Sequence, residues 1–308
     1  MDTDKVEEIM DTHIDTSIFQ GSIVALVTPF KKNGEVDEEK LRELVNWHIE
    51  EGTDAIVPCG TTGESVTMTH GEQERVIRIV LEEVKGRIPV FPGAGTNNTA
   101  ASIEMSKRAK ALGAQGVLIV CPYYNKPTQE GIFRHYTALA KEVQIPIIVY
   151  NVGSRTGTNI TAETLLRLAQ EPYIVAVKEA SGNLEQMMQI LRDRPSHFKV
   201  LAGDDAFAYP LMALGGEGCI SVVANEIPRL FRQMIHLCLD KKFEEALKLH
   251  NELLPLMKAN FIESNPIPVK TALEMMGKMK AYFRLPLCEM GEANKEKLRL
   301  VLKELNLV

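Results

Sequence analysis

The chain has 308 residues, of which 45% are hydrophobic and 25% charged, and its formal net charge is -6. A chain of this length can bury a large core, and the composition is close to that of average soluble globular proteins, which excludes an intrinsically disordered chain. The acidic balance and the lack of basic runs disfavour nucleic acid as a partner, because neutralising phosphates requires clustered Lys and Arg.

The sequence also argues against membrane insertion, secretion and metal binding. No apolar stretch approaches the ~20 residues of a membrane span. The N-terminal sequence MDTDKVEE lacks the basic start and apolar centre of a signal peptide, so we expect a cytoplasmic protein with no membrane partner. The five cysteines contain no C-x-x-C pair and the seven histidines have no paired spacing, so nothing suggests a disulfide framework or a metal site.

Residues 1–18 are acidic and precede the first clear element. Val6, Ile9, Met10 and Ile14 could form one stripe of a helix. We expect this segment to be a mobile or loosely packed N-terminal extension.

Eight short apolar runs follow, most of them rich in Val and Ile. They are residues 23–27, 55–57, 89–91, 117–120, 146–149, 174–177, 199–202 and 220–223. Continuous apolar runs indicate strands that are buried on both faces, which is typical of parallel sheets.

Segments with helical periodicity lie between these runs. Residues 37–51 have apolar residues on one face, with Asp37 to cap the start, Gly52 to end the helix, and His48 near the apolar face as an expected core histidine. A second helix is predicted where Thr69 and Glu72 have the spacing of a capping box.

Strands that alternate with helices predict an α/β fold, a (β/α)8 TIM barrel over residues 19–240. The pattern after about residue 243 is helical only, which predicts a C-terminal helical domain over residues 241–308. A doubly wound open sheet is the alternative, but GAGTNN (93–98) lacks the third glycine of a dinucleotide-binding turn.

In a barrel, the catalytic groups follow the carboxyl ends of the strands. Lys178 ends one apolar run, and a lysine in a barrel mouth loses hydration, which favours the neutral amine that forms Schiff bases. Tyr150 ends the preceding strand and could carry protons for this chemistry. Each residue alone could be structural, Lys178 as a strand-end lysine with a solvated ammonium and Tyr150 as a packed tyrosine.

Other strand-end residues are suited to binding an anion. Thr61 and Thr62 lie in a glycine-flanked turn that suits a carboxylate or a phosphate, although an ordinary turn is equally consistent with the sequence. Arg155 lies in a loop where it could grip a carboxylate or remain solvated. The pair Asp204 and Asp205 could bind a metal, but capping of the next helix is the commoner role.

These strand-end motifs together resemble the dihydrodipicolinate synthase family, which belongs to the pyruvate-dependent class I aldolase and N-acetylneuraminate lyase superfamily. The resemblance covers about residues 19–308. It is carried by FQGSIV (19–24), GTTGES (60–65), PYYNKP (122–127), YNVGSR (150–155), VKEAS (177–181), AGDD (202–205) and NPIPVK (265–270).

The resemblance implies a lyase that condenses pyruvate with L-aspartate 4-semialdehyde, on the route to lysine and diaminopimelate, with no metal or organic cofactor. It implies that Lys178 forms the Schiff base, that Tyr150 donates and accepts protons, and that Thr61 and Tyr124 complete the proton relay. Because the family's second tyrosine enters the neighbouring active site, it also implies an obligate oligomer, expected to be a homotetramer built as a dimer of dimers.

The resemblance assigns the substrate contacts as well. Thr62, the backbone at Ile220 and Gly203 match positions that bind pyruvate, and Arg155 matches the residue that positions the semialdehyde carboxylate. Gly153 stands where the family usually has proline, and it could leave the Arg155 loop less well fixed.

Relatives that are inhibited by lysine carry an acidic residue at the position of Ala101 and a histidine at that of Gln73. Other residues could still line such an allosteric pocket, namely Ser65, His70, Asn97 and Tyr123. Because an alanine cannot pair with an ammonium group, we expect weak or absent inhibition by lysine.

Three alternatives remain at this point. The nearest is another aldolase of the same scaffold, such as an N-acetylneuraminate lyase or a 2-keto-3-deoxy sugar acid aldolase. The second is a phosphate-binding barrel enzyme with GGEG (215–218) as its cradle, although this turn has no basic residue. The third is a barrel without catalytic activity that serves as a binding module.

Overall fold

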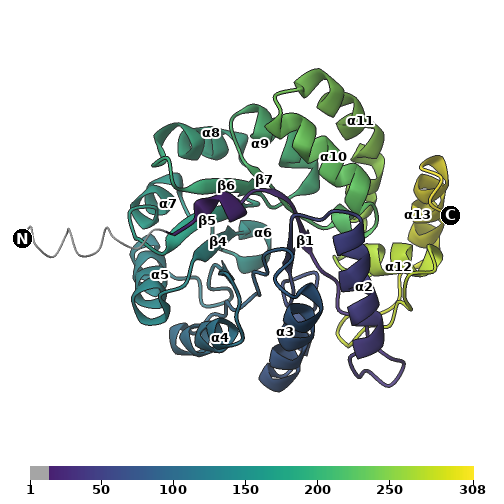
Figure 1. Ribbon diagram of the computed structural model, residues 1–308, viewed down its shortest axis with the longest axis horizontal. Helices are drawn as coiled ribbons and strands as arrows, with labels where there is room; N and C mark the ends of the chain where they lie inside the picture. The colour runs from purple at the N-terminus through teal and green to yellow at the C-terminus, as the bar shows by residue number, and fades with distance from the viewer. Residues whose placement is uncertain (1–13) are drawn as a thin grey trace, which may run out of the picture.

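The computed structural model describes residues 14–308, and its strands form one parallel sheet that curves into a barrel (Figure 1). Within these residues the sheet has seven strands in the spatial order β2-β1-β7-β6-β5-β4-β3. The strands are β1 (Gly21–Ala25), β2 (Ala55–Val57), β3 (Val117–Val120), β4 (Ile147–Asn151), β5 (Ile174–Glu179), β6 (Lys199–Ala202) and β7 (Gly218–Ser221). The predicted (β/α) barrel is confirmed.

The predicted strand over residues 89–91 closes the barrel without forming a regular strand. Val90 forms a parallel bridge to Ile56 of β2, and Gly93 forms one to Leu118 of β3. The segment contains Pro89 and Pro92, which have no N–H to donate, so a continuous ladder cannot form. The two ends of the sheet are thus joined by isolated bridges.

The predicted strand over residues 220–223 is also corrected. β7 begins two residues earlier, at Gly218, and ends at Ser221. The backbone N–H groups of Val222 and Val223 donate to the buried carboxylate of Asp205, at 3.2 and 2.8 Å, instead of to a neighbouring strand. The chain therefore turns into a 3-10 helix, η4 (Val223–Asn225).

Helices surround the barrel (Figure 1). They are α2 (Glu38–Glu50), α3 (His70–Val84), α4 (Thr99–Ala111), α5 (Gln129–Val143), α7 (Ala162–Leu168), α8 (Leu184–Asp193), α9 (Ala208–Ala213) and α10 (Pro228–Leu239). The predicted ends are confirmed for two of them: Asp37 caps α2 and Gly52 follows it with a φ of +85°, while Thr69 and Glu72 form the capping box of α3.

The chain after the barrel is helical, as predicted, and contains α11 (Phe243–Ala259), α12 (Ile267–Met275) and α13 (Glu292–Glu304). Figure 1 shows α12 and α13 to one side of the barrel, beyond α2. Leu298 and Leu302 are the buried residues of α13. A domain boundary at residue 240 remains a prediction, because α11 packs directly on α10 of the barrel.

At the N-terminus, the predicted stripe lies mostly outside the described residues, which begin after Val6, Ile9 and Met10. Ile14 packs against the side chains inside the barrel. The short 3-10 helix η1 (Thr16–Ile18) then leads into β1.

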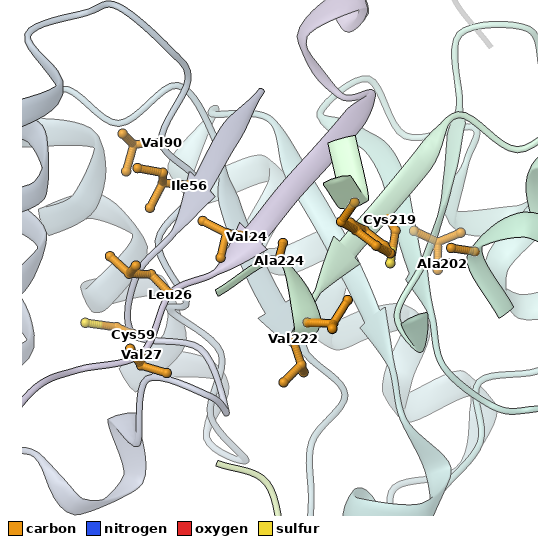
Figure 2. Close-up of a cluster of buried hydrophobic side chains, with 14 of the residues drawn as sticks. Val24, Leu26, Val27, Ile56, Cys59, Val90, Ala202, Cys219, Val222 and Ala224 are labelled. Atoms are coloured by element: carbon orange, nitrogen blue, oxygen red, sulfur yellow. The ribbon is translucent and has the colours of Figure 1, made fainter. Parts of the chain in front are cut away.

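The buried apolar residues form two clusters, one on each side of the sheet. Ile23 and Ala25 belong to the inner cluster, whereas Val24 belongs to the outer cluster between strands and helices. Figure 2 shows part of the outer cluster, with Val24, Ile56 and Cys219 on neighbouring strands. Burial on both faces explains why the strands are continuously apolar.

Candidate active site

Lys178 and Tyr150 lie side by side at the carboxyl ends of β5 and β4. They are paired in the sheet register, and the Lys178 Nζ atom lies 4.3 Å from the centroid of the Tyr150 ring. Lys178 is 5% exposed and forms no ion pair with any described residue. A buried amine without a carboxylate partner is available to a carbonyl substrate.

Lys178 lines a cavity of about 430 Å³ at this end of the barrel. The structure thereby brings together most of the predicted catalytic and binding residues. Those that line this cavity are Thr61, Thr62, Tyr150, Arg155, Lys178 and Gly203, together with Val152, Ser154, Ala180, Asp204, Val222, Phe261, Glu263, Ser264 and Asn265.

Gly203 leaves room for the Lys178 side chain. A Cβ atom at this position would lie 3.0 Å from Lys178 Cγ, 3.1 Å from Lys178 Cε and 2.7 Å from the Cβ atom of Ala180. Such contacts are closer than van der Waals packing allows. A side chain at position 203 would therefore displace the amine or its neighbour.

The turn that contains Thr61 and Thr62 is held rigidly. The backbone is left-handed at Glu64, with a φ of +53°, and Thr28 Oγ1 donates a hydrogen bond of 2.7 Å to the carbonyl of Gly63. The Glu64 carboxylate is buried against Lys270 Nζ at 2.6 Å. Burial raises the pKa of Glu64 and lowers the pKa of Lys270, each opposed by the charge of the other. An ordinary exposed turn would have neither the buried ion pair nor the buried hydrogen bond to its backbone.

Arg155 reaches the cavity from α6 (Gly153–Thr156), the short helix that follows β4. Its Nη2 donates to the backbone carbonyl of Asn265 at 3.4 Å. The turn around it is fixed despite Gly153, because the Thr156 hydroxyl bonds within the loop and Gly157 ends the helix with a φ of +74°. Arg155 is exposed and forms no ion pair among the described residues, which leaves its guanidinium free for a carboxylate.

A second cavity, of about 680 Å³, adjoins the first and shares Thr61, Tyr150 and Arg155 with it. Tyr124 lines this second cavity and not the one that contains Lys178, and its side chain is 89% exposed. Within one chain, the structure therefore does not bring Tyr124 to the amine.

Three of the four residues expected in an allosteric pocket, Ser65, His70 and Tyr123, also line the second cavity. The fourth, Asn97, does not, and its carbonyl accepts a hydrogen bond from Asn125 Nδ2 at 3.0 Å. Weak or absent inhibition by lysine stays a prediction, which a coupled activity assay with added lysine checks.

Ile220 lies in β7 opposite Ile23 of β1, and its side chain belongs to the cluster inside the barrel. It is not among the residues that line the Lys178 cavity, where Val222 lies instead. The predicted contact through the Ile220 backbone stays a prediction.

The comparison with known proteins agrees with this geometry. The model of the Dihydrodipicolinate synthetase family matches residues 18–305. The chain belongs to this family. It is 54% identical over 291 residues to a protein from Geotalea uraniireducens named 4-hydroxy-tetrahydrodipicolinate synthase. The alignment covers 94% of this chain and 100% of the relative.

Solved structures of the family superpose closely. The dihydrodipicolinate synthase from Aquifex aeolicus is 49% identical with a TM-score of 0.92, over 94% of this chain and 99% of that one. The chloride-inhibited enzyme from Acinetobacter baumannii, complexed with pyruvate, is 44% identical with a TM-score of 0.93, over 94% and 99% of the two chains. These comparisons confirm a lyase-type enzyme of the dihydrodipicolinate synthase family and disfavour the sugar acid aldolases and the inactive barrel.

The structure excludes GGEG (215–218) as a phosphate cradle at this site. The turn leads into β7, whose first residue is Gly218, and so lies at the opposite end of the barrel from Lys178. The Glu217 carboxylate already pairs with Arg194 at 2.7 Å, and Arg194 also donates to the carbonyl of Gly215. The basic group nearest this turn is therefore already bound to Glu217 and to the backbone.

The carboxylates of Asp204 and Asp205 accept hydrogen bonds from backbone N–H groups. The Asp204 carboxylate caps η3 (Asp205–Phe207) by accepting from the N–H of Ala206, which is the predicted capping role. Asp205 is buried, which raises its pKa to about 6, and it holds the start of η4. No cluster of three or more possible metal ligands occurs in residues 14–308.

Three polar residues at or beside the cavity were not predicted as site residues: Glu179, and the lining residues Asn265 and Glu263. Glu179 follows Lys178 in β5 and its buried carboxylate accepts from the Ser181 N–H at 2.7 Å and from Asn151 Nδ2 at 3.0 Å. Burial raises the pKa of Glu179. Asn265 is the first residue of the NPIPVK motif, and Glu263 lies two residues before it, so this motif is the sequence signal that points to both.

Proposed function

We propose that the chain condenses pyruvate with L-aspartate 4-semialdehyde through a Schiff base on Lys178, as a 4-hydroxy-tetrahydrodipicolinate synthase. The observation that carries this proposal is the buried, unpaired amine of Lys178 beside Tyr150 in a cavity that also contains Thr62 and Arg155. The cavity then has a nucleophile, a proton carrier and two groups that can bind carboxylates.

The proposed reaction begins when the Lys178 amine attacks the ketone carbon of pyruvate. The carbinolamine loses water to give the imine, and loss of a methyl proton gives an enamine. The enamine carbon attacks the aldehyde carbon, which forms the new C–C bond and an alkoxide that takes up a proton. The amino group of the former semialdehyde then attacks the imine carbon, closes the ring and expels Lys178.

Each of these steps moves a proton over a short distance, and Tyr150 and Thr61 line the cavity where this occurs. Their hydroxyls can pass protons between amine, carbinolamine and carbon. In the proposed arrangement Thr62, Gly203 and the Ile220 backbone bind pyruvate, and Arg155 positions the semialdehyde. No metal or organic cofactor is part of the proposal.

The third hydroxyl of the relay would come from a partner chain. Tyr124 is exposed and does not line the Lys178 cavity of its own chain, which supports its entry into the site of a neighbouring copy. We propose a homotetramer built as a dimer of dimers that works in the cytoplasm. No helix within residues 14–308 is long and apolar enough to cross a membrane.

The proposal is tested by incubation with pyruvate and borohydride, followed by intact mass and peptide mapping. We expect a reduced pyruvyl adduct on Lys178, and none in Lys178→Ala. Steady-state rates with the semialdehyde should exceed those with sugar acids. Failure to form the adduct, under conditions that label a known Schiff-base aldolase, would contradict the proposal.

A further inference from the structure

The motif NPIPVK (265–270) contacts the turn that carries Thr61 and Thr62 at two points. Asn265 Nδ2 donates to Thr62 Oγ1 at 3.0 Å, and Lys270 Nζ donates to Glu64 Oε1 at 2.6 Å. The segment at the start of α12 therefore contacts the barrel at the turn where the carboxylate of pyruvate is proposed to bind.

Asn265 also contacts the second proposed carboxylate-binding residue. Its backbone carbonyl accepts the 3.4 Å hydrogen bond from Arg155 Nη2. Its side chain is 6% exposed and lines the same cavity as Lys178. One residue outside the barrel strands thus contacts the groups proposed to hold both substrates.

The direction of the Asn265 hydrogen bond determines what the Thr62 hydroxyl can do. A threonine hydroxyl has one hydrogen to donate and two lone pairs, whereas an amide nitrogen only donates. When Asn265 Nδ2 donates to Thr62 Oγ1, the Thr62 hydrogen stays free for another acceptor. In the cavity that acceptor would be a carboxylate, and a hydrogen bond to a charged acceptor is among the stronger ones.

We infer that Asn265 is a positioning residue that orients the Thr62 hydroxyl toward the carboxylate of the keto acid. The inference rests on the proposed function and adds a residue to it. Asn265 is not required to hold the backbone of the turn, because Thr28 and the Glu64–Lys270 pair already do so. Its effect should therefore fall on pyruvate binding more than on folding.

The test is a double-mutant cycle between Asn265 and Thr62. Asn265→Asp has nearly the same shape but presents acceptors in place of the donor, so it should take up the Thr62 hydrogen and repel the substrate carboxylate. We expect the KM for pyruvate to rise by about ten- to a hundredfold, with kcat within about threefold. Asn265→Ala should raise KM less, by about three- to tenfold.

In a Thr62→Val background Asn265→Ala should change the KM for pyruvate by less than about threefold, since the hydroxyl through which it acts is absent, whereas Asn265→Asp should keep only the part of its effect that comes from charge repulsion. Asn251→Asp, an exposed position on α11, adds the same charge without these contacts and should leave KM unchanged. An unchanged KM in Asn265→Asp, or an equal effect of Asn265→Ala with and without the Thr62 hydroxyl, would overturn the inference.

Borohydride trapping separates this outcome from failure of the proposed function. With saturating pyruvate, Asn265→Asp should still give the Lys178 adduct, but half-maximal labelling should require more pyruvate, in proportion to the rise in KM. Absence of the adduct in the unsubstituted protein would instead remove the proposed function. Thermal melts of every variant show whether a change in KM accompanies a loss of folding.

Discussion

At the scale of single residues, the candidate site depends on space beside Lys178 as well as on the groups that react. Gly203 illustrates this, because its missing side chain is what allows the lysine to lie where it does. A nucleophile misplaced by about 1 Å can lose about a hundredfold in rate. The position of the amine is therefore as important as its chemistry.

We predict that Gly203→Ala lowers kcat about tenfold or more, because the added Cβ would lie 2.7 Å from Ala180 Cβ and 3.0 Å from Lys178 Cγ. Pre-steady-state trapping with borohydride measures the rate of adduct formation directly. Gly71→Ala in α3 is the matched control, since nothing lies within 4 Å of its added Cβ, and its rate should not change. Equal rates for both variants would contradict the prediction.

At the scale of elements, the helices pack through their buried faces. The buried face of α2 includes a histidine, His48. His48 is 0% exposed, which confirms the expected core histidine, and its Nδ1 lies 3.1 Å from Thr53 Oγ1. Burial lowers the pKa of His48 to about 3. The native state therefore keeps this ring neutral where an unfolded chain would protonate it.

This difference predicts a pH dependence of stability. Below about pH 6.5 the unfolded state binds a proton at His48 that the native state does not bind until about pH 3, so the native state loses stability as pH falls through this range. Thermal melts from pH 7 to pH 4 should show a smaller loss in His48→Gln than in the unsubstituted protein, with the exposed His70→Gln as control. Parallel melting curves for all three would contradict this assignment.

At the scale of the whole molecule, the C-terminal helices are joined to the barrel by a fully buried ion pair. Lys270 and Glu64 are both 0% exposed in their side chains, and Lys270 Nζ also donates to the carbonyl of Tyr282 at 2.6 Å. The rings of Phe30 and Phe283 lie within 5 Å of the ammonium, with centroids at 4.5 and 4.9 Å. Loss of one partner would leave an unpaired buried charge.

We predict that Lys270→Met destabilises the protein by about 3–5 kcal/mol, because the Glu64 carboxylate would then be buried without a partner. The double variant Lys270→Met with Glu64→Gln should recover much of this loss, since it removes the charge. Urea unfolding measures the free energy of unfolding of the single and the double variant. A loss below about 1 kcal/mol in the single variant would show that the pair does not hold the two parts together.

The proposed sharing of Tyr124 between copies can also be measured. Lys178→Ala and Tyr124→Phe should each lower activity, the first nearly completely and the second by about a hundredfold or more. A hybrid oligomer co-purified from both variants should regain activity, because one of its sites combines an intact lysine with the partner's intact tyrosine. No recovery in a verified hybrid would contradict a shared site.

Local sequence determined most of the architecture. Apolar runs, helical periodicity and capping residues such as Asp37 act over a few residues, so they could be predicted without coordinates. Lys178 and Tyr150 could be found in the same way, because parallel strands end at the same edge of a sheet. The apolar run 89–91 predicts a full strand where the structure has isolated bridges, because Pro89 and Pro92 remove hydrogen-bond donors without making the run less hydrophobic.

The tertiary structure alone decided which of these groups meet. Asn265 bonds to Thr62 across 203 residues of sequence, and Asp205 draws Val222 and Val223 out of the sheet through its buried carboxylate. The NPIPVK motif marks Asn265 but not its partner, and no local pattern shows which distant group either side chain will face. The sequence by itself therefore determined the barrel and the strand ends that carry Lys178 and Tyr150, whereas long-range packing decided how the Thr62 turn is held and that Tyr124 lies outside the Lys178 cavity of its own chain.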